Sequence, residues 1–212
     1  LVKAVTRGDG ERGDDVTQQA RRVRSIPLHL RGEGHPRVLE IRGEIFMPNS
    51  SFEMINTQRA ANGEPLFANA RNATAGTLKS FDPSIVAERK LSFLCHGRGK
   101  VVWEKSPKDW SNFVSAVKEM GIPASDMISV CQGSDSIVAE VTAFESQRAA
   151  LGFGIDGMVV RINSFAQQET LGSTSKSPRW CIAFKYPAQQ GETLLTHVEW
   201  QVGKNGTLTP RA

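Results

Sequence analysis

The chain is organised around two segments, Gly154-Ile155-Asp156-Gly157-Met158-Val159-Val160-Arg161-Ile162-Asn163 and Pro178-Arg179-Trp180-Cys181-Ile182-Ala183-Phe184-Lys185-Tyr186-Pro187. Both are rich in β-branched and aromatic residues and are bounded by Gly, Pro or Ser, which predicts two strands. Side chains on a strand point alternately to its two faces. Arg161 therefore lies opposite the apolar side chains of its segment, and Lys185 lies opposite the bulky side chains of the second segment.

These two cations suggest a binding site. Two long basic side chains on faces free of bulk, with Asp156 at a glycine-flanked strand entry, suit a cleft that binds phosphate and a metal ion. The alternative is that Arg161 and Lys185 face solvent, as most charged strand residues do. The alternation of side chains by itself leaves both interpretations open.

Length and composition set the broad class of protein. At 212 residues, the chain holds one large domain or one domain with part of another. Its 39% hydrophobic and 23% charged residues are typical of a soluble globular protein, and neither a membrane-spanning run nor a signal peptide is visible. The chain starts at Leu1 within an expected strand, Leu1–Thr6, and ends at Ala212 just after another. We therefore expect an internal fragment of a longer protein.

Charge and cysteine content narrow the choice of partner and compartment. The formal net charge of +4 and the pI of about 9.1 suit a polyanionic partner without identifying one. The three cysteines, Cys95, Cys131 and Cys181, form no C-x-x-C motif, which argues against a zinc site or a disulfide framework. Free thiols predict a reducing, cytoplasmic setting.

Two motifs in the first 46 residues have both a structural and a functional interpretation. Thr6-Arg7-Gly8-Asp9-Gly10 suits a hairpin turn, or a backbone that approaches a ligand closely, and a helix is expected from about Asp15 to Val23. Leu39–Phe46 alternates, with Glu44 on its polar face next to Gly43. The pattern favours a solvated face of ion pairs over a carboxylate that accepts hydrogen bonds from a sugar hydroxyl.

Phe67–Leu78 consists almost entirely of small residues around Arg71. Small residues let backbone amides or a helix start approach a phosphate, to which Arg71 adds charge. The alternative is a tightly packed junction between a loop and a helix, capped by Asn72.

Helices and strands are expected in most of the remaining chain. Patterns of apolar residues predict helices at 48–62, from Ser106 as the cap to Gly121, and at 134–151. Leu91–Gly97 is expected to be a strand, and its lone His96 is interpreted as structural. Alternation over Thr193–Val202, a turn and a further short strand predict the opening of a second, all-β domain after Gly191.

Together these stretches resemble the adenylation domain of bacterial NAD-dependent DNA ligases. The resemblance covers nearly the whole chain and rests on six segments in order: Thr6–Gly10, Glu40–Glu44, Phe67–Gly76, Asp156–Arg161, Ala183–Pro187 and Val202–Gly206 with Thr209-Pro210. It implies an α+β nucleotidyltransferase domain of packed antiparallel sheets with flanking helices over residues 1–191. Residues 192–212 would begin an oligonucleotide-binding (OB-fold) β-barrel.

The resemblance also implies the activity. An active-site lysine attacks the α-phosphorus of NAD and releases nicotinamide mononucleotide, the AMP moves to a 5′-phosphate at a nick in duplex DNA, and a 3′-hydroxyl displaces it. Such enzymes act in DNA replication and repair with NAD and Mg²⁺, and zinc belongs to a C-terminal part of the parent. We expect nicked double-stranded DNA as partner, a monomer, no membrane and a cytoplasmic location.

By the family's pattern, each candidate residue has a role. Arg7 and Glu44 would hold the adenosine ribose, Asp156 would act catalytically on the metal side, and Lys185 would neutralise the α-phosphate. His96 and Arg161 would line the adenine site, and Arg71 would contact DNA backbone or adenylate phosphate.

The chain departs from the family pattern at three points that bear on activity. No K-x-D-G motif is present, so its nucleophilic lysine is expected upstream of Leu1 and the fragment is not expected to adenylate itself. Arg161 stands where the family has lysine, and His96 where it has an aromatic ring, usually tyrosine. The alternatives are an ATP-using ligase or capping guanylyltransferase, and a non-catalytic nucleic-acid-binding remnant.

Overall fold

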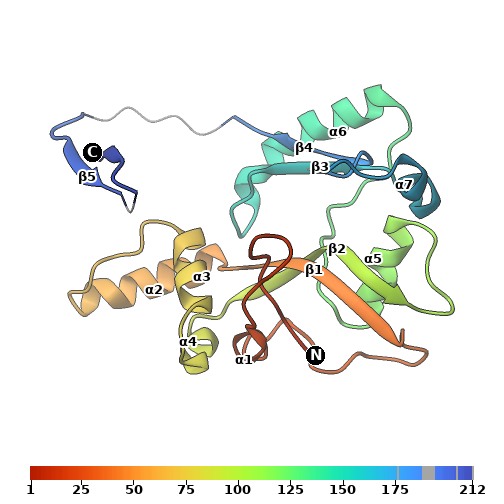
Figure 1. The fold of residues 1–212 in the computed structure, drawn as a ribbon, viewed down its shortest axis with the longest axis horizontal. Coiled ribbons are helices and arrows are strands. Elements are labelled where there is room, and N and C mark those ends of the chain that lie inside the picture. Colours follow the sequence, from red (N-terminus) through yellow and green to blue (C-terminus); the bar gives the residue numbers. More distant parts are fainter. Residues whose placement is uncertain (176, 188–193, 204, 212) are drawn as a thin grey trace.

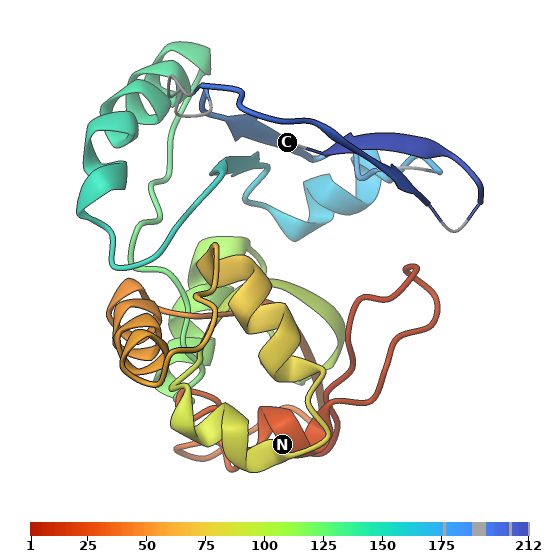
Figure 2. The same cartoon turned by 90° about the vertical axis from the view of Figure 1, so that its left-hand side faces the viewer.

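The computed structural model describes residues 1–175, 177–187, 194–203 and 205–211. Its elements form two layers, one above the other in Figures 1 and 2. The first, here called the β1–β2 layer, contains α1 (Thr17–Ala20), β1 (Val38–Phe46), α2 (Asn49–Ala61), α3 (Ala70–Leu78), α4 (Pro83–Glu88), β2 (Ser92–Val102) and α5 (Trp110–Glu119). The second, the β3–β4 layer, contains α6 (Ser134–Gln147), the 3₁₀ helix η1 (Arg148–Ala150), β3 (Gly157–Arg161), α7 (Phe165–Leu171) and β4 (Cys181–Lys185).

All sheets in the described part of the chain are antiparallel pairs, β1 with β2, β3 with β4, and β5 with β6. Helices flank the first two pairs, as Figure 1 shows. The expectation of a mixed fold of antiparallel sheets and helices is therefore confirmed, with sheets that are only two strands wide.

The alternation predicted for β1 is confirmed. Leu39, Ile41 and Ile45 pack against the buried clusters, whereas the acidic and basic residues between them are exposed. Gly43 lies under the Phe93 ring of β2, which a Cβ atom at that position would overlap. The glycine that would otherwise weaken this strand is required by that close approach.

Two clusters of apolar residues form the core of the β1–β2 layer. The stripe predicted for the helix after residue 106 is buried, and this cluster comprises Cys95, Trp110, Phe113, Val114, Val117, Ile122 and Ala124, with Phe165 of the β3–β4 layer packed into it. The other cluster comprises Val23, Met47, Ile55, Ala73, Val86 and Leu91. Gly121 has a φ of +86°, a backbone conformation that suits the residue after a helix end.

Several expected boundaries were wrong because polar side chains capped other helix positions. The side chain of Asp109, rather than Ser106, accepts from the backbone N–H of Asn112 and begins α5. Asn69, rather than Asn72, caps α3.

At the N-terminus the expected strand is reduced to one bridge between Val5 and Asp15, and α1 is shorter than expected.

Two short helices were not predicted, since six or seven residues carry little periodicity. Asp82 caps α4, which has proline in its first turn, and Ser164 caps α7. Both caps match sequence signals for a helix start. Those signals, rather than an apolar stripe, identify these helices.

The β3–β4 layer has a small core. Met158 and Val160 of β3 pack with Val141, Phe144 and Tyr186. The Tyr186 hydroxyl donates to the Val141 carbonyl oxygen of α6 at 2.6 Å. This bond ties the end of β4 to the helix that covers the pair.

The C-terminal strands β5 (Glu199–Val202) and β6 (Leu208–Arg211) form an exposed hairpin, which Figure 1 shows apart from β3 and β4. One hairpin does not establish a barrel, so the OB-fold stays a prediction. The expected boundary near Gly191 lies outside the described residues. In the described ranges, none of the helices has the length and apolar character needed to cross a membrane.

Candidate adenylate-binding site

The antiparallel pairing of β3 and β4 makes Asp156 and Lys185 neighbours along the main chain, and the side chain of Lys185 is exposed. Lys185 is the register partner of Gly157, and the Tyr186 N–H donates to the Asp156 carbonyl oxygen at 3.3 Å. A Cβ atom at Gly157 would collide with the carbonyl oxygen of Phe184, so the Asp-Gly sequence allows this close pairing. The prediction that the two segments are strands is confirmed, and the pairing makes these two charged residues neighbours.

Arg71 reaches the same point from another element. It lies in the first turn of α3, and its Nη1 is 3.6 Å from Oδ2 of Asp156. The side chains are 82% and 73% exposed, so the ion pair contributes at most about 1 kcal/mol and either partner is free to exchange. The structure therefore places the residue expected to contact DNA next to the residue expected on the metal side.

The small residues around Arg71 serve packing. Ala73, Thr74 and Thr77 are buried against the rest of the layer, and Thr77 accepts from Nη1 of Arg89 at 2.7 Å. The interpretation of Phe67–Leu78 as a tightly packed junction is thus confirmed, while Arg71 points away from it to solvent.

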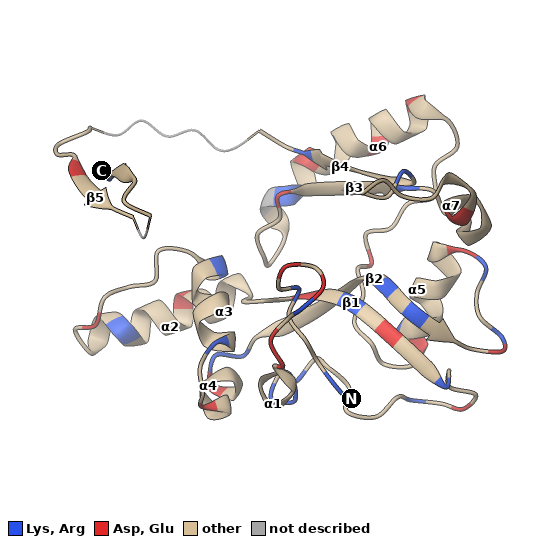
Figure 3. Ribbon diagram, in the orientation of Figure 1, with Lys and Arg blue, Asp and Glu red and all other residues tan. Residues whose placement is uncertain are grey.

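Glu44 and His96 lie on the central pair of strands. Glu44 is exposed and pairs in register with Leu94, two residues before His96. The register shift between Arg42 and Gly43 leaves His96 without a partner residue in β1, and its side chain is exposed. Figure 3 shows basic and acidic residues interspersed along β1 and β2.

The polar face of β1 contains the expected ion pair, but within one strand. Nε of Arg42 is 3.3 Å from Oε1 of Glu40. The Glu40 carboxylate also accepts from the Lys100 N–H at 3.1 Å, and this hydrogen bond, assisted by Arg42, lowers the pKa of Glu40. Among the ion pairs of the described residues, none includes Glu44.

Arg161 does not face solvent. Its guanidinium lies 4.1 Å from the centre of the Trp110 ring, and its Nη2 donates to the His96 carbonyl oxygen at 2.9 Å. Burial lowers the pKa of Arg161 from its usual value, although an arginine stays charged. The structure therefore brings Arg161 and His96 together, with the guanidinium on the main chain of His96.

Arg7 lies on the N-terminal hairpin and is exposed. Gly8 and Gly10 have φ values of +53° and +102°, and the Gly10 N–H donates to the Arg7 carbonyl oxygen at 3.0 Å. The Asp9 carboxylate accepts from the N–H groups of Arg12 and Glu11, which lowers the pKa of Asp9. The hairpin interpretation of this motif is confirmed, and its glycines serve the turn.

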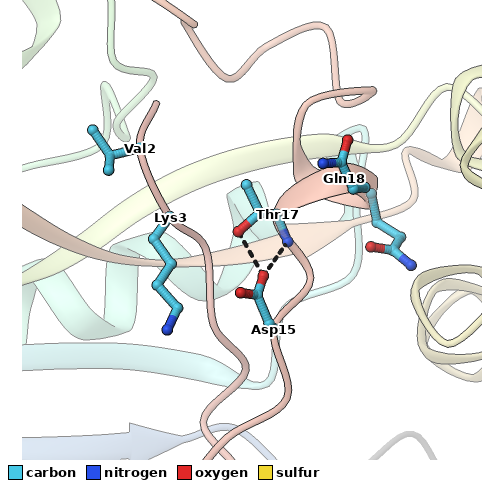
Figure 4. Close-up of a pocket in the computed structure, with 6 residues that line it drawn as sticks. Val2, Lys3, Asp15, Thr17 and Gln18 are labelled. Atoms are coloured by element: carbon cyan, nitrogen blue, oxygen red, sulfur yellow. Dashed lines mark hydrogen bonds between the residues drawn. The ribbon is translucent and has the colours of Figure 1, made fainter.

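A surface hollow of about 570 Å³ lies elsewhere, beside the start of α1. In it, Thr17 donates to Asp15 from its N–H at 2.9 Å and its hydroxyl at 2.6 Å, as Figure 4 shows. The hollow is lined by Val2, Lys3, Asp15, Thr17, Gln18 and Gln19. It contains none of the residues expected to bind nucleotide.

Sequence patterns did not reveal the contacts that join the two layers. Trp110 was correctly expected in the core, but its role as the platform for Arg161 depends on a distant strand. Asn163 also escaped notice: its side chain accepts from the Ser111 N–H at 3.0 Å. No local signal predicts either contact.

Most of the site residues thus fall into two groups, with Asp156, Arg71 and the neighbouring main chain of Lys185 in one and Glu44, His96 and Arg161 in the other. Arg7, on its hairpin, belongs to neither group. A protein-family comparison matches residues 1–189 to the NAD-dependent DNA ligase adenylation domain. That match spans both layers and both groups of site residues. This chain belongs to the NAD-dependent DNA ligase adenylation domain family.

Proposed function

We propose that this chain supplies the adenylate-binding residues of an enzyme that uses NAD to join a 5′-phosphate to a 3′-hydroxyl at nicks in duplex DNA. Membership of the family supports the reaction class. The observation that supports the proposal is the ion pair of Arg71 with Asp156, at the end of the β3–β4 pair where the main chain of Lys185 lies next to that of Asp156. An exposed pair of arginine and carboxylate, with an exposed lysine on the adjoining strand end, suits phosphate chemistry.

The proposed roles follow from what phosphoryl transfer requires. Such reactions depend mostly on positioning and on stabilising the charge of the phosphoryl group. The Lys185 ammonium would neutralise the α-phosphate while a lysine of the parent enzyme attacks the phosphorus and nicotinamide mononucleotide leaves. The AMP is then bonded through its phosphorus to the lysine nitrogen. Attack by the 5′-phosphate of DNA on that phosphorus breaks the bond to lysine and transfers the AMP to DNA.

The nucleoside would be held from the β1–β2 layer. The Glu44 carboxylate forms no ion pair in the described residues and is available to accept hydrogen bonds from ribose hydroxyls. The exposed imidazole of His96 would stack on adenine, and Arg161 holds the main chain of His96 at the edge of that site. Arg7, on its hairpin, would complete the ribose contacts.

Asp156 fits a magnesium ion only as one ligand among several. Among the described residues, no group of three His, Cys, Asp or Glu side chains could hold a metal ion. Mg²⁺ commonly keeps several waters and binds one or two carboxylates together with substrate phosphates, so a lone exposed carboxylate is sufficient. When bound, the ion would supply charge neutralisation at the phosphates.

Arg71 is proposed to contact a DNA or adenylate phosphate. Its present partner is an exposed carboxylate at 3.6 Å, a weak pair that a phosphate would replace. We further propose a cytoplasmic monomer that acts in replication and repair. Cys95, Cys131 and Cys181 are free, which suits a reducing compartment.

Nucleotide binding by the 212-residue chain tests the proposal. We expect calorimetric titration with AMP and with NAD to show saturable binding that Lys185→Met weakens at least about tenfold, because a charge-assisted phosphate contact is lost. Lys105→Met, which removes the same charge from an exposed turn, is the matched control and leaves affinity unchanged. A crystal soaked with AMP should place adenosine between Glu44 and Lys185; adenosine bound elsewhere would refute the assignment.

The cofactor is tested in a complete ligase that contains this domain. We expect sealing of nicked duplex DNA with NAD and none with ATP alone. Lys185→Met should lower the sealing rate about a hundredfold, the typical effect of removing one preorganised charge-stabilising group. Sealing with ATP alone would identify an ATP-using enzyme, and no sealing with either nucleotide would favour a nucleic-acid-binding remnant.

A further inference from the structure

Two arginines cross between the layers in opposite directions. Arg161, at the end of β3, lies 4.1 Å from the ring centre of Trp110, which begins α5. Arg98 of β2 lies 3.5 Å from the ring centre of Phe165, which begins α7. Each layer therefore supplies one cation and one aromatic ring to the other, and we call these four residues the reciprocal clasp.

Backbone hydrogen bonds fix the aromatic side of this clasp. The Trp110 N–H donates to the Asn163 carbonyl oxygen at 2.9 Å, and the Phe165 N–H donates to the Lys108 carbonyl oxygen at 3.0 Å. Both rings are more than nine-tenths buried and belong to one apolar cluster. Each ring is thus held in place by a main-chain hydrogen bond and by burial, and one guanidinium group lies over each ring.

The clasp connects the two groups of site residues, because Arg161 belongs to one of them and lies on the same strand pair as the other. Arg161 is the last residue of β3, which begins directly after Asp156. β3 pairs with β4, whose last residue is Lys185. Its Nη2 also holds the main chain of His96 at 2.9 Å, opposite the strand that carries Glu44. A change in this contact would alter the spacing between the two groups.

We propose that Arg161 is a positioning residue, which acts through Trp110 and the His96 carbonyl to hold the two layers at the spacing that one bound adenylate requires. The inference rests on the proposed function. The resemblance implies a lysine at this position, and the two contacts made here suit an arginine instead. A planar guanidinium stacks on a ring and donates in its own plane at the same time, whereas a lysine ammonium is a point charge without that fork.

The test compares AMP affinity across variants of the 212-residue chain by calorimetry. We expect Trp110→Leu and Arg161→Lys each to weaken binding by about threefold to tenfold, the range of a partly buried cation–π contact. The double variant should bind no more weakly than the poorer single variant, because both changes break one contact. Trp110→Phe, which keeps a ring, should restore affinity close to that of the unmodified chain.

The matched control is Arg148→Leu. Arg148 lies 5.8 Å from the ring centre of Tyr186, so it makes the same kind of contact within one layer. We expect unchanged AMP affinity. Phe165→Leu tests the other half of the clasp and should also weaken binding. It replaces Trp110→Leu in the test if circular dichroism shows that Trp110→Leu does not fold.

Two results would overturn the inference. One is unchanged affinity in Trp110→Leu or Phe165→Leu together with lost affinity in Arg161→Leu, since Arg161 would then act on the nucleotide itself. The other result is obtained without nucleotide, and it is needed if the unmodified chain binds neither AMP nor NAD. That lack of binding would refute the proposed function but would leave the clasp to be tested. The clasp is then judged by urea unfolding without nucleotide, where additive effects of Arg161→Leu and Trp110→Leu refute it and coupled effects support a contact that positions the layers.

Discussion

The β1–β2 layer and the β3–β4 layer differ in how completely they bury apolar residues. The first has two clusters in which Phe113 and Val86 are fully buried. The second has one small cluster, and on its outer strand Ile182 and Phe184 remain 68% and 45% exposed. Regions with few buried apolar contacts open more easily than well-packed ones. The layer that carries Asp156 and Lys185 is therefore the less stable one, and it depends on its neighbour for support.

The largest effect is expected at the centre of the better-packed layer. Phe113→Ala should lower the free energy of unfolding by about 3–5 kcal/mol, because a fully buried ring is replaced by a cavity. Urea denaturation followed by circular dichroism measures this. Phe81→Ala, at a fully exposed phenylalanine, is the control and should change stability by less than about 0.5 kcal/mol. Equal effects of the two changes would contradict the assigned core.

A smaller effect is expected where the β3–β4 pair is tightest. Gly157→Ala places a Cβ atom against the Phe184 carbonyl oxygen and should cost about 1–3 kcal/mol through strand displacement. Gly154→Ala is the matched control, since nothing lies within 4 Å of a Cβ atom there. Denaturant unfolding and AMP titration should both detect the first change. Full stability in Gly157→Ala would show that the strands pair less closely.

A still smaller effect is expected at the Asp109 cap, which lies where the layers meet, in a bridge with Ser164. Asp109→Ala should cost about 1 kcal/mol by leaving helix N–H groups unsatisfied. The Asn112 N–H, assisted by side-chain hydrogen bonds, lowers the pKa of Asp109, so its contribution is present above its unfolded pKa and lost as pH falls through the folded value. Urea unfolding between about pH 7 and pH 3 should show a smaller acid loss in Asp109→Asn, which still caps, than in the unmodified chain. An identical pH profile would contradict this.

The smallest effect is expected at the exposed contact between the layers. Arg71→Met removes the ion pair with Asp156 and should change the free energy of unfolding by less than about 1 kcal/mol, since both side chains are largely exposed. Affinity for nicked DNA, measured by fluorescence anisotropy at low salt, should nevertheless fall, because a phosphate contact is proposed there. Lys105→Met again serves as the control for charge. A large loss of stability would mean that this pair, rather than the clasp, joins the layers.

Local patterns predicted local features of the site well. The strand character of β3 and β4, the exposed Glu44 and the hairpin at Arg7 all follow from nearest-neighbour properties of the chain. Helix starts were less accurate, since several polar residues near each start compete for one cap, and Asp109 and Asn69 cap their helices instead of the expected Ser106 and Asn72. The role of each site residue came from the resemblance to a family rather than from the patterns themselves.

By itself, the sequence determined the periodic elements, the identity of the core stripe of α5 and the family to which the chain belongs. Only the tertiary structure decided which partner each charged side chain has, such as the Asp156 carboxylate for Arg71 and the main-chain carbonyl of His96 for Arg161. The physical reason is the range of the interactions. Periodicity reflects the geometry of neighbouring residues, whereas these contacts depend on how two separately formed layers pack against each other.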